Sequence, residues 1–166
     1  MARRVFFSFH FDHDIWRANQ VRNSNVVVGP DVAGFFDHSE YEEAKKQGAE
    51  AIRRMILRHL QNTTVTAVLI GTYTAYRPWV QYEIQQSIER QNGLLGIYIH
   101  HLRDQNGRTS LPGPLPFVTA NVVFPVYAWD ANAARFRLQI EAAGKRAEEM
   151  RARSQALKRL FGIRRL

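Results

Sequence analysis

The chain has 166 residues, of which 45% are hydrophobic and 23% charged, the composition of an ordinary globular domain with its own core. It contains no cysteine, which excludes disulfides, thiolate metal sites and a cysteine nucleophile. The net charge of +8 gathers at one end. Residues 145–166 hold eight Lys/Arg and two Glu, a net of +6, and residues 1–144 carry only the remaining +2.

The first part of the chain predicts a buried strand over residues 5–9, whose near-continuous apolarity indicates burial on both faces. A polar helical segment follows over residues 12–23, then a short second strand over residues 26–28. Residues 29–38 form a loop rich in Gly, Pro and Asp. Neither a signal peptide nor a run as long as a membrane span is visible, so we expect a cytoplasmic protein.

The second part continues the alternation of helices and strands. Apolar residues at helical spacing predict a helix over residues 39–60. Strands are then predicted at residues 65–71, 94–99 and 122–127, the last at an edge because Pro125 interrupts it. Pro78 suits the first position of a helix over residues 78–91, and a long loop occupies residues 103–116. The chain is predicted to be helical from Ala131 almost to its end.

This alternation predicts an α/β protein of flavodoxin-like type, a three-layer sandwich around a five-stranded parallel sheet. The expected strand order is 2-1-3-4-5, with the strand at residues 5–9 in the interior. Residues 1–144 are interpreted as one domain and residues 145–166 as a basic amphipathic helical extension. We expect the extension to place its large apolar side chains on one side: Met150, Leu157, Leu160 and Phe161.

Several functions common in this architecture lack their motifs. No glycine-rich dinucleotide fingerprint follows the first strand, and there is no Walker A sequence. A phosphoacceptor site would need an Asp after the third strand, where Gly71 and Thr72 stand. Four side chains after the first strand have the chemistry of metal ligands: His10, Asp12, His13 and Asp14. No distant partner is evident for them, and the two aspartates suit the start of a helix, so no metal is predicted.

Trp79 and Glu83 lie four residues apart and therefore share one face of their helix. They follow a buried strand, where open α/β sheets bind ligands. Taken alone, the pair is better explained by a core tryptophan and a solvated glutamate than by a site. The role of the basic tail is also undecided by the sequence. A basic helix can contact nucleic acid, anionic lipid or an acidic partner, but its charged face is more often simply solvated.

Three motifs, in the same order along the chain, carry a family resemblance. They are Phe7-Ser-Phe-His-Phe-Asp12, Trp16-Arg-Ala-Asn-Gln-Val-Arg-Asn23 and Asn92-Gly-Leu-Leu-Gly-Ile-Tyr-Ile-His100. Together with Arg77-Pro-Trp79-Val-Gln-Tyr-Glu83, they resemble the TIR-like proteins of the bacterial Thoeris antiphage system over roughly the first 130 residues. The sequence departs from most TIR domains at Phe9-His10, at Val80 and in the loop at residues 29–38, which leaves assembly through that loop open.

The resemblance implies a flavodoxin-like fold and cleavage of NAD⁺ into a cyclic ADP-ribose isomer that activates a separate effector. Glu83 would be the catalytic carboxylate, because breaking the nicotinamide–ribose bond develops positive charge on the ribose and releases a neutral group. Trp79 and either Phe9 or Phe11, but not both, are expected to wall the pocket. His10 and Asp12 would contact hydroxyls or phosphate. NAD⁺ is then a substrate, and no cofactor or metal is predicted.

Three functions therefore follow from the sequence. The favoured one is an antiphage NAD⁺ glycohydrolase/cyclase with a phage-derived trigger, a diffusible nucleotide signal to its effector, and no membrane partner. The alternative is a non-catalytic TIR-like interaction or sensory module, in which Glu83 is a surface residue. A nucleic-acid-binding accessory protein that uses residues 145–166 is the weakest. The product isomer and the oligomeric state, a homo-oligomer included, remain open.

Overall fold

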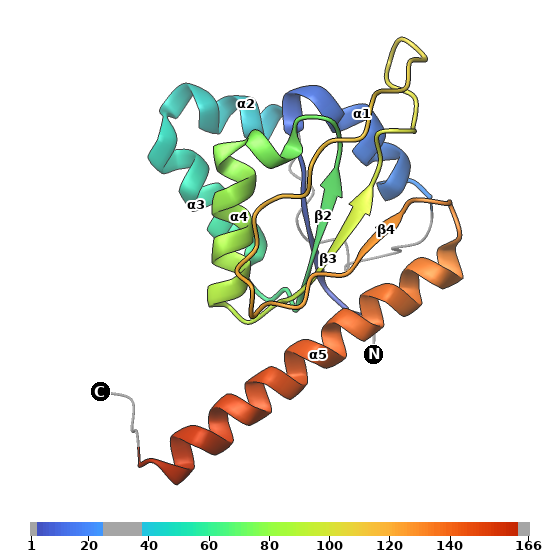
Figure 1. Cartoon of the computed structure of the whole chain (residues 1–166). Helices are drawn as coiled ribbons and strands as arrows, with labels where there is room; N and C mark the ends of the chain where they lie inside the picture. Colours follow the sequence, from blue (N-terminus) through green and yellow to red (C-terminus); the bar gives the residue numbers. More distant parts are fainter. Residues whose placement is uncertain (1–2, 25–37, 163–166) are drawn as a thin grey trace.

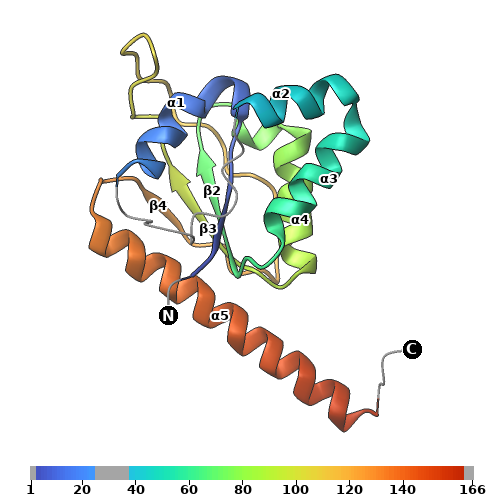
Figure 2. The same ribbon diagram turned by 180° about the vertical axis from the view of Figure 1, so that it is seen from behind.

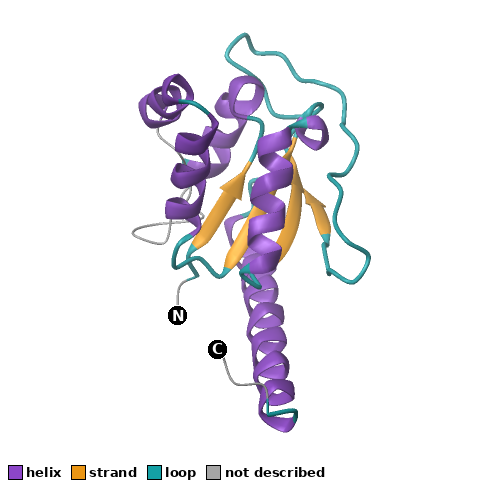
Figure 3. Cartoon of the chain, turned by 90° about the vertical axis from the view of Figure 1, so that its left-hand side faces the viewer, coloured by secondary structure: helices purple, strands orange, loops and turns teal. Residues whose placement is uncertain are grey.

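The structure is a computed structural model that describes residues 3–24 and 38–162. Four parallel strands form the sheet within these residues, in the order β1-β2-β3-β4 (Figures 1 and 3). The strands are β1 (Val5–Ser8), β2 (Val65–Ile70), β3 (Gly93–Tyr98) and β4 (Val126–Ala128). The helices are α1 (Phe11–Arg22), α2 (His38–Gln47), α3 (Ala49–Leu60), η1 (Thr74–Tyr76), α4 (Pro78–Glu89) and α5 (Ala133–Leu160).

The parallel α/β architecture is confirmed, but the sheet differs in detail from the five strands predicted. The described residues contain four strands, and the strand expected at residues 26–28 lies outside them, as does most of the loop at residues 29–38. The last strand, β4, begins at Val126 rather than at residue 122. Val122 belongs instead to a turn, in which its N–H donates to the Thr119 carbonyl. Pro125 precedes the strand, and its carbonyl accepts from the Gly96 N–H at 2.8 Å.

The sheet buries both of its faces. On one face, strand residues pack against α4, in a cluster of Val68, Ile70, Val80, Ile84 and Leu94. Neighbouring strand residues point the opposite way. These residues, Leu69 and Leu95 among them, belong to the larger core that includes Phe136 and Ile140 of α5. The near-continuous apolar strands therefore reflect a two-sided core, as the sequence predicted.

The helix predicted over residues 39–60 is two helices. Gly48 separates α2 from α3 and has a φ of +101°, which a right-handed helix cannot contain. The chain turns there, so that α3 lies beside α4 and α2 leads back toward α1 (Figure 1). This break has a functional consequence, because it brings a residue of α2, Tyr41, beside the residues that follow β1.

The long helix α5 runs without interruption from Ala133 to Leu160, across the boundary proposed at residues 144 and 145. Its first half lies on the sheet, and its second half extends past the sheet's lower end (Figures 1 and 2). Contact is close, because a Cβ on Gly93 would lie 1.9 Å from the Ala143 carbonyl oxygen. Beyond Ala147, the residues predicted to share a side are exposed: Met150, Leu157, Leu160 and Phe161.

These contacts predict that two truncations of α5 differ in stability. Ending the chain after residue 144 removes the buried Ala147, the ion pair of Arg3 with Glu148, and the bond from Arg146 to the Leu94 carbonyl. We expect a loss of about 2 kcal/mol, or roughly 5 °C in Tm. Ending it after residue 152 keeps all three and should shift Tm by no more than about 2 °C. Equal melting temperatures in calorimetry would contradict this difference.

Among the residues that the structure describes, no helix is both long enough and apolar enough to cross a bilayer.

Candidate active site

Glu83 lies at the carboxyl ends of the strands, in the position where parallel sheets bind ligands. Pro78 occupies the first turn of α4, and Val80 and Glu83 follow on the side that faces the sheet. The carboxyl group of Glu83 is reached by Ser8, the last residue of β1, whose hydroxyl donates to Glu83 Oε2 at 2.5 Å. This hydrogen bond joins β1 to α4 through two residues that lie 75 positions apart in the sequence.

Glu83 is buried, with 4% of its surface exposed. This burial is inconsistent with a solvated glutamate, the explanation that the helix segment alone favoured. Burial raises the pKa of Glu83 to about 8, and the hydrogen bond from Ser8 opposes this increase. At neutral pH the group is mostly protonated, and ionisation begins in the range where an acid–base group can operate.

Aromatic rings form the walls around this carboxyl group. Phe9 and Phe11 stack with ring centroids 5.8 Å apart, and Phe11 stacks on Tyr41 at 4.3 Å. Both phenylalanines line the cavity in front of Glu83, which corrects the expectation that only one of them does. Trp79 closes another side and meets Tyr82 edge to face at 5.9 Å. These walls exclude water from the carboxyl group and offer faces for planar rings.

The polar part of the wall comes from His10 and Arg77. Burial lowers the pKa of His10, and the nearby positive charge of Arg77 lowers it further. His10 is therefore neutral at pH 7 and can serve as a hydrogen-bond donor and acceptor. Its Nδ1 is buried and has no hydrogen-bond partner within residues 3–24 and 38–162. A ligand hydroxyl in the cavity could satisfy that atom.

Asp12 does not line this cavity. Its side chain is about half exposed, and its carboxylate lies 3.7 Å from Lys45 Nζ on α2. The neighbouring polar residues do come together, because His10, His13 and Asp14 have ligand-type atoms within 4.8 Å of one another. Asp14, however, accepts from the guanidinium of Arg17 at 3.0 Å in the buried interior. This adjacent positive charge favours a hydrogen-bonded cluster over a cation site.

The cavity in front of Glu83 has a volume of about 30 Å³, which is room for about one water molecule. Ligand pockets usually measure about 300–1,000 Å³, so a nicotinamide ring enters only if the aromatic walls move apart. Chemically, the site combines a desolvated carboxyl group, a neutral imidazole, a guanidinium and several aromatic faces. That set can bind a planar ring and stabilise positive charge. Its nucleophilic groups, among the described lining and bonded residues, are those of Glu83, Ser8, His10 and Tyr41.

Sequence reasoning identified five of these residues: Phe9, His10, Phe11, Trp79 and Glu83. It missed Ser8, Tyr41 and Arg77. The sequence did contain a signal for Ser8, because it is the only polar residue in the apolar segment over residues 5–9. The sequence contained no such signal for Tyr41, because Tyr41 reaches the cavity only through the turn at Gly48.

Comparison with known proteins connects this geometry to a family. The family described as "Thoeris protein ThsB, TIR-like domain" matches residues 6–104, which include the whole cavity. A protein of Bacillus cereus (strain MSX-D12) is 48% identical over 119 residues and bears the name "Putative cyclic ADP-D-ribose synthase ThsB1". The aligned region spans 70% of this chain and 62% of that relative.

Proposed function

The chain belongs to the TIR-like family of the Thoeris protein ThsB, and on this premise we propose that it cleaves NAD⁺ and forms a cyclic ADP-ribose-type signal. The observation that supports the proposal best is the buried Glu83 at the carboxyl ends of the strands, held by Ser8 and walled by aromatic rings. The name of the Bacillus cereus relative points to the same chemistry.

In the proposed reaction, the bond between the nicotinamide nitrogen and C1′ of the ribose breaks. Its electron pair leaves with nicotinamide, which becomes neutral and needs no general acid. The ionised carboxylate of Glu83 offsets the positive charge that develops on the ribose. A nucleophilic atom of the ADP-ribose part then forms the new bond to C1′ and releases its proton if it carries one. Walls that exclude water favour this ring closure over hydrolysis.

Four wall residues have a task in this scheme. Trp79 and Phe11 stack on the planar rings of the substrate. The neutral His10 contacts a ribose hydroxyl, and Arg77 supplies a positive charge for the pyrophosphate. Ser8 acts as a positioning residue, because it contacts Glu83 rather than the reacting atoms. The product would then activate a separate effector, and a phage-derived trigger would start the reaction.

The direct test is to incubate the purified protein with NAD⁺, with and without extract from phage-infected cells, and to separate the products by chromatography. We expect NAD⁺ to disappear while nicotinamide and a cyclic ADP-ribose isomer appear in equal amounts. No loss of NAD⁺ under either condition would contradict the proposal and favour a non-catalytic interaction module.

The raised pKa of Glu83 predicts how the activity depends on pH. Since the ionised carboxylate is the active form, kcat/KM should rise with pH and level off above the pKa of about 8. At pH 7 it should be roughly one tenth of its plateau. Ser8→Ala removes the hydrogen bond that lowers the pKa of Glu83 and should move the rising limb to higher pH.

The matched control is Ser87→Ala, which removes another buried hydroxyl of this region. Ser87 bonds the Glu83 carbonyl and Thr66 but not the carboxyl group. The kcat/KM of Ser87→Ala should rise over the same pH range as that of the wild type. If the kcat/KM of Ser8→Ala rises over the same pH range as that of the wild type, Ser8 does not set the pKa of Glu83.

A further inference from the structure

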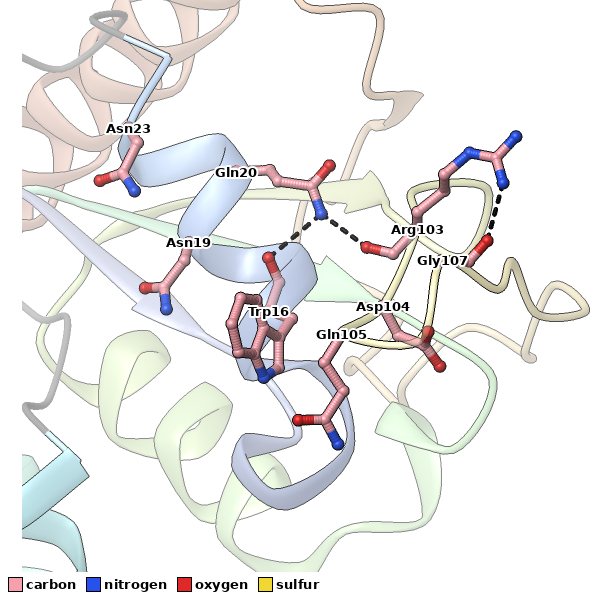
Figure 4. A pocket seen from close by; sticks show the side chains of 8 residues that line it. All are labelled: Trp16, Asn19, Gln20, Asn23, Arg103, Asp104, Gln105 and Gly107. Carbon is pink, nitrogen blue, oxygen red and sulfur yellow. Dashed lines mark hydrogen bonds between the residues drawn. The ribbon is translucent and has the colours of Figure 1, made fainter.

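A second cavity lies on the outer side of α1, away from Glu83. It is an open groove of about 770 Å³ between α1 and the loop at residues 103–107 (Figure 4). Trp16, Asn19 and Asn23 line one wall, with spacings of three and four residues that place them on one face of the helix. Gln105 comes from the opposite wall. The described residues that line this groove and those that line the cavity at Glu83 do not overlap.

The groove is built on a fixed frame. Arg17 is almost fully buried and donates to the Leu102 and Arg108 carbonyls at 2.9 and 3.0 Å, which ties the loop to α1. On the surface, Gln20 donates to the Arg103 carbonyl at 2.7 Å, as the dashed line in Figure 4 shows. The two walls are therefore fixed relative to each other before any ligand arrives, so binding does not have to order the loop.

The groups left free to bind a ligand have one chemistry. Arg103 donates to the Gly107 carbonyl, and one oxygen of Asp104 accepts from the amides of Asn106 and Arg108. The carboxamides of Asn19, Asn23 and Gln105, by contrast, have no hydrogen-bond partner within the described part of the chain. Beside them the indole of Trp16 is 54% exposed. The groove thus offers an aromatic face and unpaired carboxamides.

We propose that this groove binds the adenosine moiety of a nucleoside or nucleotide, with adenine stacked on Trp16 and paired to one of the three carboxamides. A carboxamide donates to N7 and accepts from the 6-amino group of adenine at the same time. Stacking of a base on an aromatic side chain tolerates any base, so the carboxamide supplies the selectivity. Arg103 and Asp104 cancel in charge, which suits a neutral ring with its phosphate toward solvent. The volume is that of a nucleotide-sized ligand.

The chain itself offers a direct probe. It has three tryptophans, so a ¹⁵N-labelled sample gives three indole N–H signals, and Trp16→Phe identifies the one from the groove. We expect adenosine to shift the Trp16 signal saturably and inosine to bind several-fold more weakly. Inosine has the same sugar and a similar ring but an acceptor in place of the 6-amino group. AMP and ribose 5-phosphate distinguish the base from the phosphate, and AMP should bind at least as well as adenosine.

Variants assign the contacts. Trp16→Ala should weaken adenosine roughly tenfold or more, because stacking contributes about 1–3 kcal/mol. One of Asn19→Ala, Asn23→Ala and Gln105→Ala should abolish the preference for adenosine over inosine. Phe117→Ala removes a ring outside the groove that is even more exposed than Trp16, and Glu83→Gln changes the other cavity. Both variants should bind adenosine as the wild type does.

Three results would overturn the assignment: no saturable shift at the Trp16 signal, equal binding of adenosine and inosine, or ribose 5-phosphate binding as well as AMP. Because binding is measured without NAD⁺ turnover, failure of this proposal leaves the proposed reaction at Glu83 untouched. Likewise, the NAD⁺ turnover of Glu83→Gln, whether lost or kept, does not bear on the proposal that the groove binds adenosine.

Discussion

Glu83→Gln is expected to lower kcat/KM for NAD⁺ by about 100-fold or more, the loss typical of removing one electrostatic group from a transition state. The substitution keeps the shape of the side chain and an oxygen that can accept from the Ser8 hydroxyl. It removes the negative charge that would face the developing positive charge on the ribose. The measurement is NAD⁺ consumption at pH 8.5, where the wild-type carboxyl group is mostly ionised.

Glu89→Gln provides the matched control for this experiment. It makes the same chemical change two turns further along α4, at an exposed carboxylate that is bonded only to the side chains of Gln85 and Gln86 among the described residues. Its activity should equal that of the wild type. If Glu83→Gln keeps the turnover of an active wild type, Glu83 is not the catalytic carboxylate.

The spacing of Trp79 and Glu83 predicted only that they share a helix face after a buried strand, and the family resemblance assigned the pair to a site. Spacing says nothing of depth, however. Glu83 was expected near the surface, since glutamates are rarely buried without a partner, and its partner Ser8 comes from a different element of the fold. A pKa raised by burial was therefore beyond the reach of sequence reasoning.

The two phenylalanines illustrate a different limit. Phe9 and Phe11 were treated as either core or pocket, and the structure makes them both at once, since each is 6% exposed and both line the cavity. The strand ends at Ser8 and α1 begins at Phe11, so the chain turns between the two rings and stacks them. The turn at Gly48 is similar, because it was hidden inside a continuous helical pattern and yet delivers Tyr41 to the site.

The burial of Glu83 also predicts that Glu83→Gln stabilises the protein at alkaline pH. In the unfolded chain the carboxyl group titrates near its ordinary pKa of 4.5, whereas in the folded protein its pKa is about 8. The folded state therefore holds the proton more tightly. Stability contributed by this group is complete below pH 4.5 and is lost as the pH rises toward 8.

The expected size follows from the same two pKa values. By linkage, ionising Glu83 costs the folded protein on the order of 4 kcal/mol at pH 8 relative to pH 4.5. Glutamine stays neutral throughout, so the variant should match the wild type near pH 4 and melt roughly 10 °C higher at pH 8.5. Differential scanning calorimetry of wild type, Glu83→Gln and Glu89→Gln at both pH values measures this difference, with Glu89→Gln following the wild type. Parallel stability curves for wild type and Glu83→Gln would mean that the folded protein does not desolvate this carboxyl group, and the pH dependence predicted for catalysis would fail with it.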